Sequence, residues 1–155
     1  MQKITPFLWF DNQAEEAMNF YCSIFPNSKS GEVTHYESES LPAGNITEVT
    51  FELDGQQFMA MNGGPHFQFS PAISLFVNCE TQAEVDELWE KLSHGGEKQQ
   101  CGWVRDKFGV SWQIIPADLG RMLQDADKKK SQNVMQAMLQ MQKIEIEVLQ
   151  AAYER

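Results

Sequence analysis

Basic residues are scarce in this sequence of 155 residues, with 12 Lys and Arg against 22 Asp and Glu. Proteins bind nucleic acid largely by neutralising its phosphates with Lys and Arg, so a net charge of −10 argues against such a partner. Long apolar runs are also missing, and no segment approaches the ~20 apolar residues that a membrane span requires. The first ten residues hold too short an apolar run for a signal peptide. We therefore expect a cytoplasmic protein that binds neither nucleic acid nor membrane.

Cysteine and histidine are equally sparse, with three of each. The cysteines are far apart and form no CxxC pair, so neither a disulfide framework nor a zinc site is predicted for Cys22, Cys79 and Cys101. A nucleophilic Cys101 would need a neighbouring base, and ordinary packing is the alternative. The histidines show no HxH or HExxH spacing, and His66, beside a Gly-Gly-Pro turn, is a better candidate for chemistry than His35 or His94.

The residues that are present follow one plan twice. In the first half a strand is followed by a helix and then by two or three strands. Asn12 and Glu15 have the spacing of a capping box at the start of this helix. An Asp-Gly pair predicts a tight hairpin between the last two of these strands. The predicted strands are Ile4–Phe10, Glu32–Glu37, Asn45–Asp54 and Gln57–Met61.

The second half repeats this order after the turn residues Asn62–Pro65. Thr81 and Glu84 form a second capping box, and Gln13 and Gln82 occupy the same place in the two boxes, 69 positions apart (82 − 13). Two capping boxes could agree by chance, but the shared order of elements favours a duplication. The predicted strands of this half are Ala72–Val77, Gln100–Arg105 and Val110–Ile115, with a turn at Asp106–Gly109.

The pattern changes after Pro116. A short helix over Asp118–Ala126 and a long helix over Ser131–Tyr153 are predicted, and the long one is apolar over more than half of its circumference. It could be held between its own domain and a partner subunit, or it could be buried in its own fold. We therefore predict one α+β domain over 1–155, with modules at 1–65 and 71–117 and a helical extension at 118–155.

Aromatic, methionine and amide side chains gather on the predicted strands of both modules. Apolar walls with a few well-placed amides are typical of small-molecule sites. For any single residue, a place in the core of a sheet is the alternative, but as a group they favour a lined cavity. They are Trp9, Phe10, Met59, Met61, Asn62, Trp103, Trp112 and Gln113.

Three stretches of the sequence carry a family pattern: FLWFDNQAEEAMNFYCSIFPNS, FMAMNGGPHFQFSPAISLFVNCETQAEVDELWEKL and CGWVRDKFGVSWQIIP. They resemble the PhnB-like family of the vicinal oxygen chelate superfamily. The C-terminal helix of that family is similar to the tail VMQAMLQMQKIEIEVLQAAYE. Members of this family are labelled 3-demethylubiquinone-9 3-methyltransferase-like. The resemblance implies paired βαβββ modules, a curved mixed sheet around a cleft (the glyoxalase/bleomycin resistance/dioxygenase fold), and a homodimer.

Metal-dependent members of that superfamily take His and Glu ligands from the first and last strands of each module. Matched by register, those places hold Pro6, one of the residues 60–62, Ala72 and Gln113. Because a divalent transition metal prefers imidazole or carboxylate donors, we predict that the metal site is lost, and we predict no cofactor.

Two functions follow from the resemblance. The first is a metal-free protein that binds a small molecule in the cleft. The second is an enzyme acting on a small molecule, by methyl transfer or as a lyase or isomerase of the glyoxalase or dioxygenase type. We expect the cleft to be lined by Trp9, Met59, Met61, Asn62, Cys101, Trp103, Trp112 and Gln113.

Overall fold

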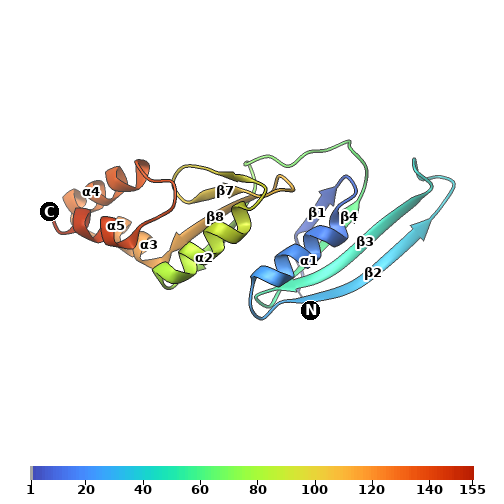
Figure 1. The fold of residues 1–155 in the computed structure, drawn as a ribbon, viewed down its shortest axis with the longest axis horizontal. Helices are drawn as coiled ribbons and strands as arrows, with labels where there is room; N and C mark the ends of the chain where they lie inside the picture. Colours follow the sequence, from blue (N-terminus) through green and yellow to red (C-terminus); the bar gives the residue numbers. More distant parts are fainter. Residues whose placement is uncertain (1) are drawn as a thin grey trace. The chain divides into compact units, whose positions relative to one another are not determined.

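The structure is a computed structural model that describes residues 2–155. The chain divides into two compact units, Met1–Gln68 and Phe69–Arg155, which we call the N-terminal and C-terminal units. Each unit contains a helix packed on a four-stranded mixed sheet (Figure 1). The predicted α+β class with two βαβββ modules is confirmed, because each unit has a strand, a helix and three further strands in this order. Both sheets also have the same strand order.

The N-terminal unit has the order β1-β4-β3-β2 across its sheet. Strands β1 and β4 are parallel, and the remaining neighbours are antiparallel. The Asp54-Gly55 hairpin forms as predicted, with both residues at positive φ (48° and 78°), which is the geometry that this pair favours. The elements are β1 (Phe7–Phe10), α1 (Ala14–Ile24), β2 (Lys29–Glu37), β3 (Asn45–Leu53) and β4 (Gln56–Asn62).

The start of α1 differs from the prediction. Its N-cap is Gln13 rather than Asn12, and the side chain of Gln13 makes no capping hydrogen bond. The N–H of Ala14 instead donates to Oδ1 of Asn62 at 2.8 Å. A free N–H at a helix start needs an acceptor, and here the acceptor comes from the end of β4, 48 positions away.

The C-terminal unit repeats the arrangement with the order β5-β8-β7-β6. Its capping box is confirmed at Thr81, whose hydroxyl accepts from the N–H of Glu84 at 3.1 Å. The short strand β6 was not predicted, and Cys101, predicted on a strand, lies in a turn at φ 59°. The elements are β5 (Ser74–Cys79), α2 (Gln82–Ser93), β6 (Glu97–Lys98), β7 (Trp103–Arg105) and β8 (Ser111–Pro116).

The C-terminal extension holds three helices, so the prediction of one long helix over Ser131–Tyr153 is wrong. They are α3 (Ala117–Leu123), α4 (Lys128–Leu139) and α5 (Ile146–Tyr153). The chain leaves the helical path where the carbonyls of Met141 and Gln142 accept from the N–H groups of Cys101 and Gly102, at 2.9 and 2.8 Å. Tertiary hydrogen bonds thus replace the bonds that would have continued the helix.

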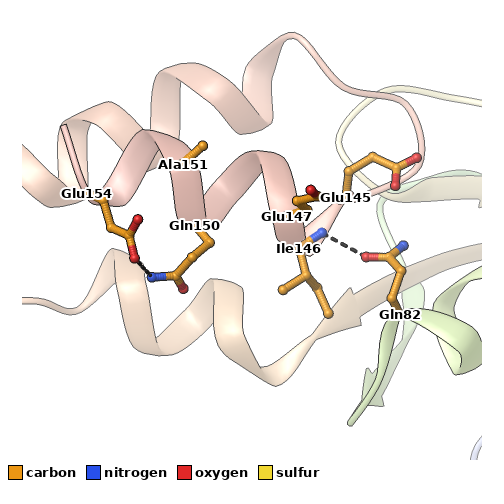
Figure 2. Close-up of a pocket in the computed structure, with 7 residues that line it drawn as sticks. All are labelled: Gln82, Glu145, Ile146, Glu147, Gln150, Ala151 and Glu154. Carbon is orange, nitrogen blue, oxygen red and sulfur yellow. Dashed lines mark hydrogen bonds between the residues drawn. The ribbon is translucent and has the colours of Figure 1, made fainter.

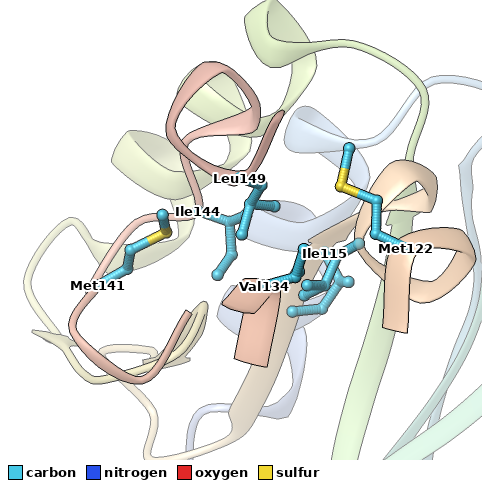
Figure 3. Close-up of a cluster of buried hydrophobic side chains, with 7 residues drawn as sticks. Ile115, Met122, Val134, Met141, Ile144 and Leu149 are labelled. Carbon is cyan, nitrogen blue, oxygen red and sulfur yellow. The ribbon is translucent and has the colours of Figure 1, made fainter. Parts of the chain in front are cut away.

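The extension has its own apolar core, shown in Figure 3. Ile115 at the end of β8 joins it, which fixes the helices to the sheet of the same unit. The other buried members are Leu119, Met122, Val134, Met141, Ile144 and Leu149.

Some apolar side chains of α4 and α5 stay on the surface, with Met135, Leu139 and Val148 between 40 and 53% exposed. The homodimer implied by the resemblance stays a prediction. Within residues 2–155, no helix is long and apolar enough to cross a bilayer.

Candidate functional site

Each sheet has one face covered by its helix and one face turned away from it. In β3 the buried residues Val49, Phe51 and Leu53 alternate with half-buried polar ones. The rings of Phe51 and Tyr21 of α1 lie 6.4 Å apart, so this buried row faces the helix. We call the opposite side, on which the intervening residues lie, the open face of the sheet.

Two rows of side chains cross the open face of the N-terminal sheet. The strand register places Trp9, Met61, Glu48 and Thr34 in one row, all of them half-buried. The second row runs beside it and contains Phe7, which is 45% exposed, Met59 and Thr50. The open face therefore combines a large partly exposed apolar surface with a single carboxylate in its first row.

Trp9 is held in place by the loop that follows β4. Its Nε1 donates to the carbonyl of Gly64 at 2.9 Å, and its ring meets that of Phe67 edge-on at 4.9 Å. A Cβ added to Gly63 would lie 2.3 Å from the indole, so only glycine fits beneath this ring. The indole is thus oriented before any ligand arrives, which lowers the entropic cost of binding.

The open face of the C-terminal sheet carries an equivalent row. Phe76, Gln113 and Trp103 are register partners on β5, β8 and β7. Phe76 is 53% exposed, and Nε2 of Gln113 donates to Oγ of Ser74 at 3.0 Å. Phe76 follows Phe7 by 69 positions (76 − 7), the same spacing as that between Gln13 and Gln82. The duplication thus places an aromatic residue on both open faces.

The eight residues that were expected to line the cleft therefore fall into two groups. Five of them lie on the open faces: Trp9, Met59, Met61, Trp103 and Gln113. The other three, Asn62, Cys101 and Trp112, make contacts inside their own units.

The contacts of this second group are structural. Asn62 caps α1, and Cys101 belongs to the turn that joins the extension, with its Sγ 3.7 Å from the carbonyl oxygen of Met138. Trp112 is 3% exposed, and its Nε1 donates to Oδ2 of Asp106 at 2.8 Å. The buried carboxylate of Asp106 also accepts from the N–H groups of Phe108 and Val110, at 2.9 and 3.0 Å.

Glu48 was not among the predicted site residues, although its signal is present in the sequence. Strict alternation in Asn45–Asp54 places Val49, Phe51 and Leu53 on one face, and the same alternation places Glu48 on the other. What the sequence could not supply is the register that sets Glu48 beside Met61.

Two of the three thiols, those of Cys79 and Cys22, offer little nucleophilic chemistry. Burial raises the pKa of Cys79 to about 12, and the negative charge of Glu84 adds to the effect. Burial likewise raises the pKa of Cys22. Both thiols therefore stay protonated near neutral pH, and the thiolate, which is the reactive form, is scarce. His66, the best histidine candidate, is exposed in the loop after β4.

The residues on the open faces do not fit the metal that the superfamily uses. The paired first and last strands present Phe7 with Met59, Trp9 with Met61, Ser74 with Ser111 and Phe76 with Gln113. These pairs contain no imidazole and no carboxylate, the donors that a divalent transition metal prefers. In the part of the chain that the structure describes, no three His, Cys, Asp or Glu side chains lie close enough together to hold a metal ion. The absence of a metal itself stays a prediction.

A surface hollow of about 690 Å³ lies within the C-terminal unit, between the start of α2 and α5 (Figure 2). Gln82 joins its two sides, because its Oε1 accepts from the N–H of Ile146 at 2.7 Å and its Nε2 donates to the carbonyl of Ile144 at 3.0 Å. The same amide group of Gln82 donates to Asp86, which lowers the pKa of that carboxyl, and the ion pair of Asp86 with Lys143 at 2.9 Å acts in the same direction. The hollow thus marks where the extension is fastened to α2. It is lined by Gln82, Glu145, Ile146, Glu147, Gln150, Ala151 and Glu154.

Comparisons with known proteins agree with this architecture. The family model described as 3-demethylubiquinone-9 3-methyltransferase matches residues 2–115. The PhnB protein of Bacillus cereus, which carries that same name as a provisional description, is 40% identical, with 75% of this chain and 100% of that chain covered and a TM-score of 0.67.

More distant structures share the fold alone. A Pseudomonas aeruginosa protein is 20% identical over 75% of this chain and 98% of its own, with a TM-score of 0.58. The fosfomycin resistance protein FosX of Listeria monocytogenes is 16% identical over 80% of this chain and 98% of its own, with a TM-score of 0.59. No curated protein sequence matches the chain.

Proposed function

This chain belongs to the 3-demethylubiquinone-9 3-methyltransferase family, and from that premise we propose that it binds a small, partly aromatic molecule on the open faces of its sheets, without a metal. The observation that carries this proposal is the open face of the N-terminal sheet. There Phe7, Trp9, Met59 and Met61 form an apolar surface that α1 does not cover. Exposed apolar surface rimmed by polar groups is typical of ligand sites.

The C-terminal sheet supports the same proposal with a more polar surface. Gln113 lies between Phe76 and Trp103 in the strand register, and its amide is oriented by Ser74. An oriented amide between two aromatic side chains can fix a ligand by hydrogen bonding while the rings cover its apolar part. Three of the predicted residues would affect binding only indirectly. Asn62 would act by holding α1, Cys101 by holding the extension, and Trp112 by holding Asp106.

Methyl transfer is the second candidate, and the family description favours it. The residues present do not fit S-adenosylmethionine in the usual way, because neither strand-to-helix turn contains a glycine-rich loop. Asp11-Asn12-Gln13 follows β1, and Glu80-Thr81 follows β5. Calorimetry with S-adenosylmethionine separates the two functions, since measurable binding would favour the enzyme.

A positive charge in the apolar part of the open face should weaken binding. We expect Met59→Lys to reduce the small molecules retained from a metabolite extract at least about tenfold, because a hydrated ammonium would replace apolar surface that the ligand covers. Met59 is suitable because its register partners, Phe7 and Thr50, carry no charge. The measurement is mass spectrometry of compounds released from the protein after gel filtration.

The matched control is Ile73→Lys, which makes the same kind of change at a side chain that is 80% exposed outside the strands. It should retain the same compounds as the unmodified protein. Circular dichroism of both variants checks the fold. Equal retention by Met59→Lys and Ile73→Lys would contradict the proposed site.

A further inference from the structure

Glu48 is the one carboxylate in the row of side chains that crosses the N-terminal open face through Trp9 and Met61. We propose that it selects the ligand of this face, favouring a small aromatic molecule with an ammonium or another hydrogen-bond donor and rejecting anions. This inference rests on the proposed function, because it specifies the class of molecule that the same face binds.

The first step is the position of Glu48. Its register partner on β4 is Met61, and the partner of Met61 on β1 is Trp9. Two strand spacings thus separate Glu48 from Trp9, which is about 10 Å between their backbones. An aromatic amine of that length could place its ring beside the Trp9 indole and its body over Met61, with its ammonium at the carboxylate.

The second step is the state of the carboxylate. Glu48 is half-buried, and across residues 2–155 its carboxylate has no hydrogen-bond or ion-pair partner. Glu52, four positions along the same strand and on the same face, already has partners. Its Oε1 accepts from Nε2 of Gln57 at 2.7 Å, and Lys29 lies 3.7 Å from its Oε2.

The third step is the cost of covering Glu48. A ligand that lies over Met61 removes water from the neighbouring carboxylate, and a carboxylate that loses water without gaining a donor is destabilised. A ligand with a donor at that end restores the lost interaction. An anionic ligand adds repulsion to the loss of water, and the net charge of −10 acts in the same direction. Selection therefore comes as much from rejecting the wrong ligand as from attracting the right one.

Three probes with the same phenyl group test this inference: 2-phenylethylamine, 2-phenylethanol and 3-phenylpropanoate. Ligand-observed NMR titrations would measure their affinities for the unmodified protein, Glu48→Gln and Glu52→Gln. We expect the unmodified protein to bind the amine at least about tenfold more tightly than the carboxylate, the size of one charge-assisted hydrogen bond. In Glu48→Gln the ratio should fall towards one, whereas Glu52→Gln should keep it.

The outcomes separate this inference from the proposed function. If the probes bind without a preference for the amine, or if Glu48→Gln keeps that preference, the selection by Glu48 is wrong and the binding face stands. If none of the three probes binds the unmodified protein, the proposed binding face fails and the selection fails with it. Near-UV circular dichroism of both variants checks that the nearly isosteric changes leave the fold intact.

Discussion

Replacing Asp106 by Ala should lower the free energy of unfolding by about 4 kcal/mol, since three donors would lose a charged acceptor at a cost of roughly 1–3 kcal/mol each, with partial relaxation. Asp106 is only 2% exposed, and its carboxylate accepts from the N–H groups of Phe108 and Val110 and from the indole of Trp112. This carboxylate therefore organises the turn between β7 and β8. Urea unfolding followed by circular dichroism measures the change.

Two further variants make the expectation specific. In Asp106→Asn the amide oxygen can still accept from the backbone, but its NH₂ group would face the indole N–H of Trp112, so we expect a loss of about 2 kcal/mol. Asp11→Ala, at an exposed aspartate, should stay within about 0.5 kcal/mol of the unmodified protein. If Asp106→Ala cost no more than Asp11→Ala, the structural role of the buried carboxylate would be wrong.

Replacing Leu149 by Ala should be nearly as costly, with an expected loss of about 3 kcal/mol from the cavity that it leaves. Leu149 is fully buried in the core of the extension, against residues of α3, α4 and the segment before α5. The same urea titration measures the loss.

The neighbouring residue supplies the control. Val148 is 51% exposed on the same helix, so Val148→Ala should change the stability by less than about 0.5 kcal/mol. Similar losses for the two variants would mean that α5 does not pack through the face that contains Leu149. A measured mass in solution that changes for Val148→Ala but not for Leu149→Ala would instead place α5 in an interface between subunits.

Apart from the short β6, the strands were the most predictable part of this fold, because each of them carries its own signal. In β3 the alternation of buried and half-buried residues is visible in the sequence, and the Asp54-Gly55 pair fixes the turn to β4. The same alternation identifies one face of the sheet as a lined surface. Trp9, Met59 and Met61 were predicted from their residue types on strands, and the alternation in β3 contained, without being used, the position of Glu48.

Contacts between distant segments could not be predicted in this way. The apolar pattern of the C-terminal region continues through residues 140–145, yet the chain bends there because Cys101 and Gly102 bind the carbonyls of Met141 and Gln142. Asn62 appeared to be a turn residue or a ligand, and it caps a helix 48 positions away. In each case the local structure is set by a hydrogen bond to a residue far away in the sequence, and a local sequence pattern cannot identify that residue.

The most direct test of the proposed binding face is an NMR titration of the protein labelled at its methionine methyl groups and at its nitrogens, with 2-phenylethanol as a neutral probe. The sequence has eight methionines, of which Met59 and Met61 lie on the open face, whereas Met18, Met122 and Met141 are buried in the cores of their units. We predict that the methyl signals of Met59 and Met61 shift on titration, together with the indole N–H of Trp9, and that those of the buried methionines do not. Unchanged signals at Met59 and Met61, or larger shifts at Met135 and Met138 of the extension, would contradict the account.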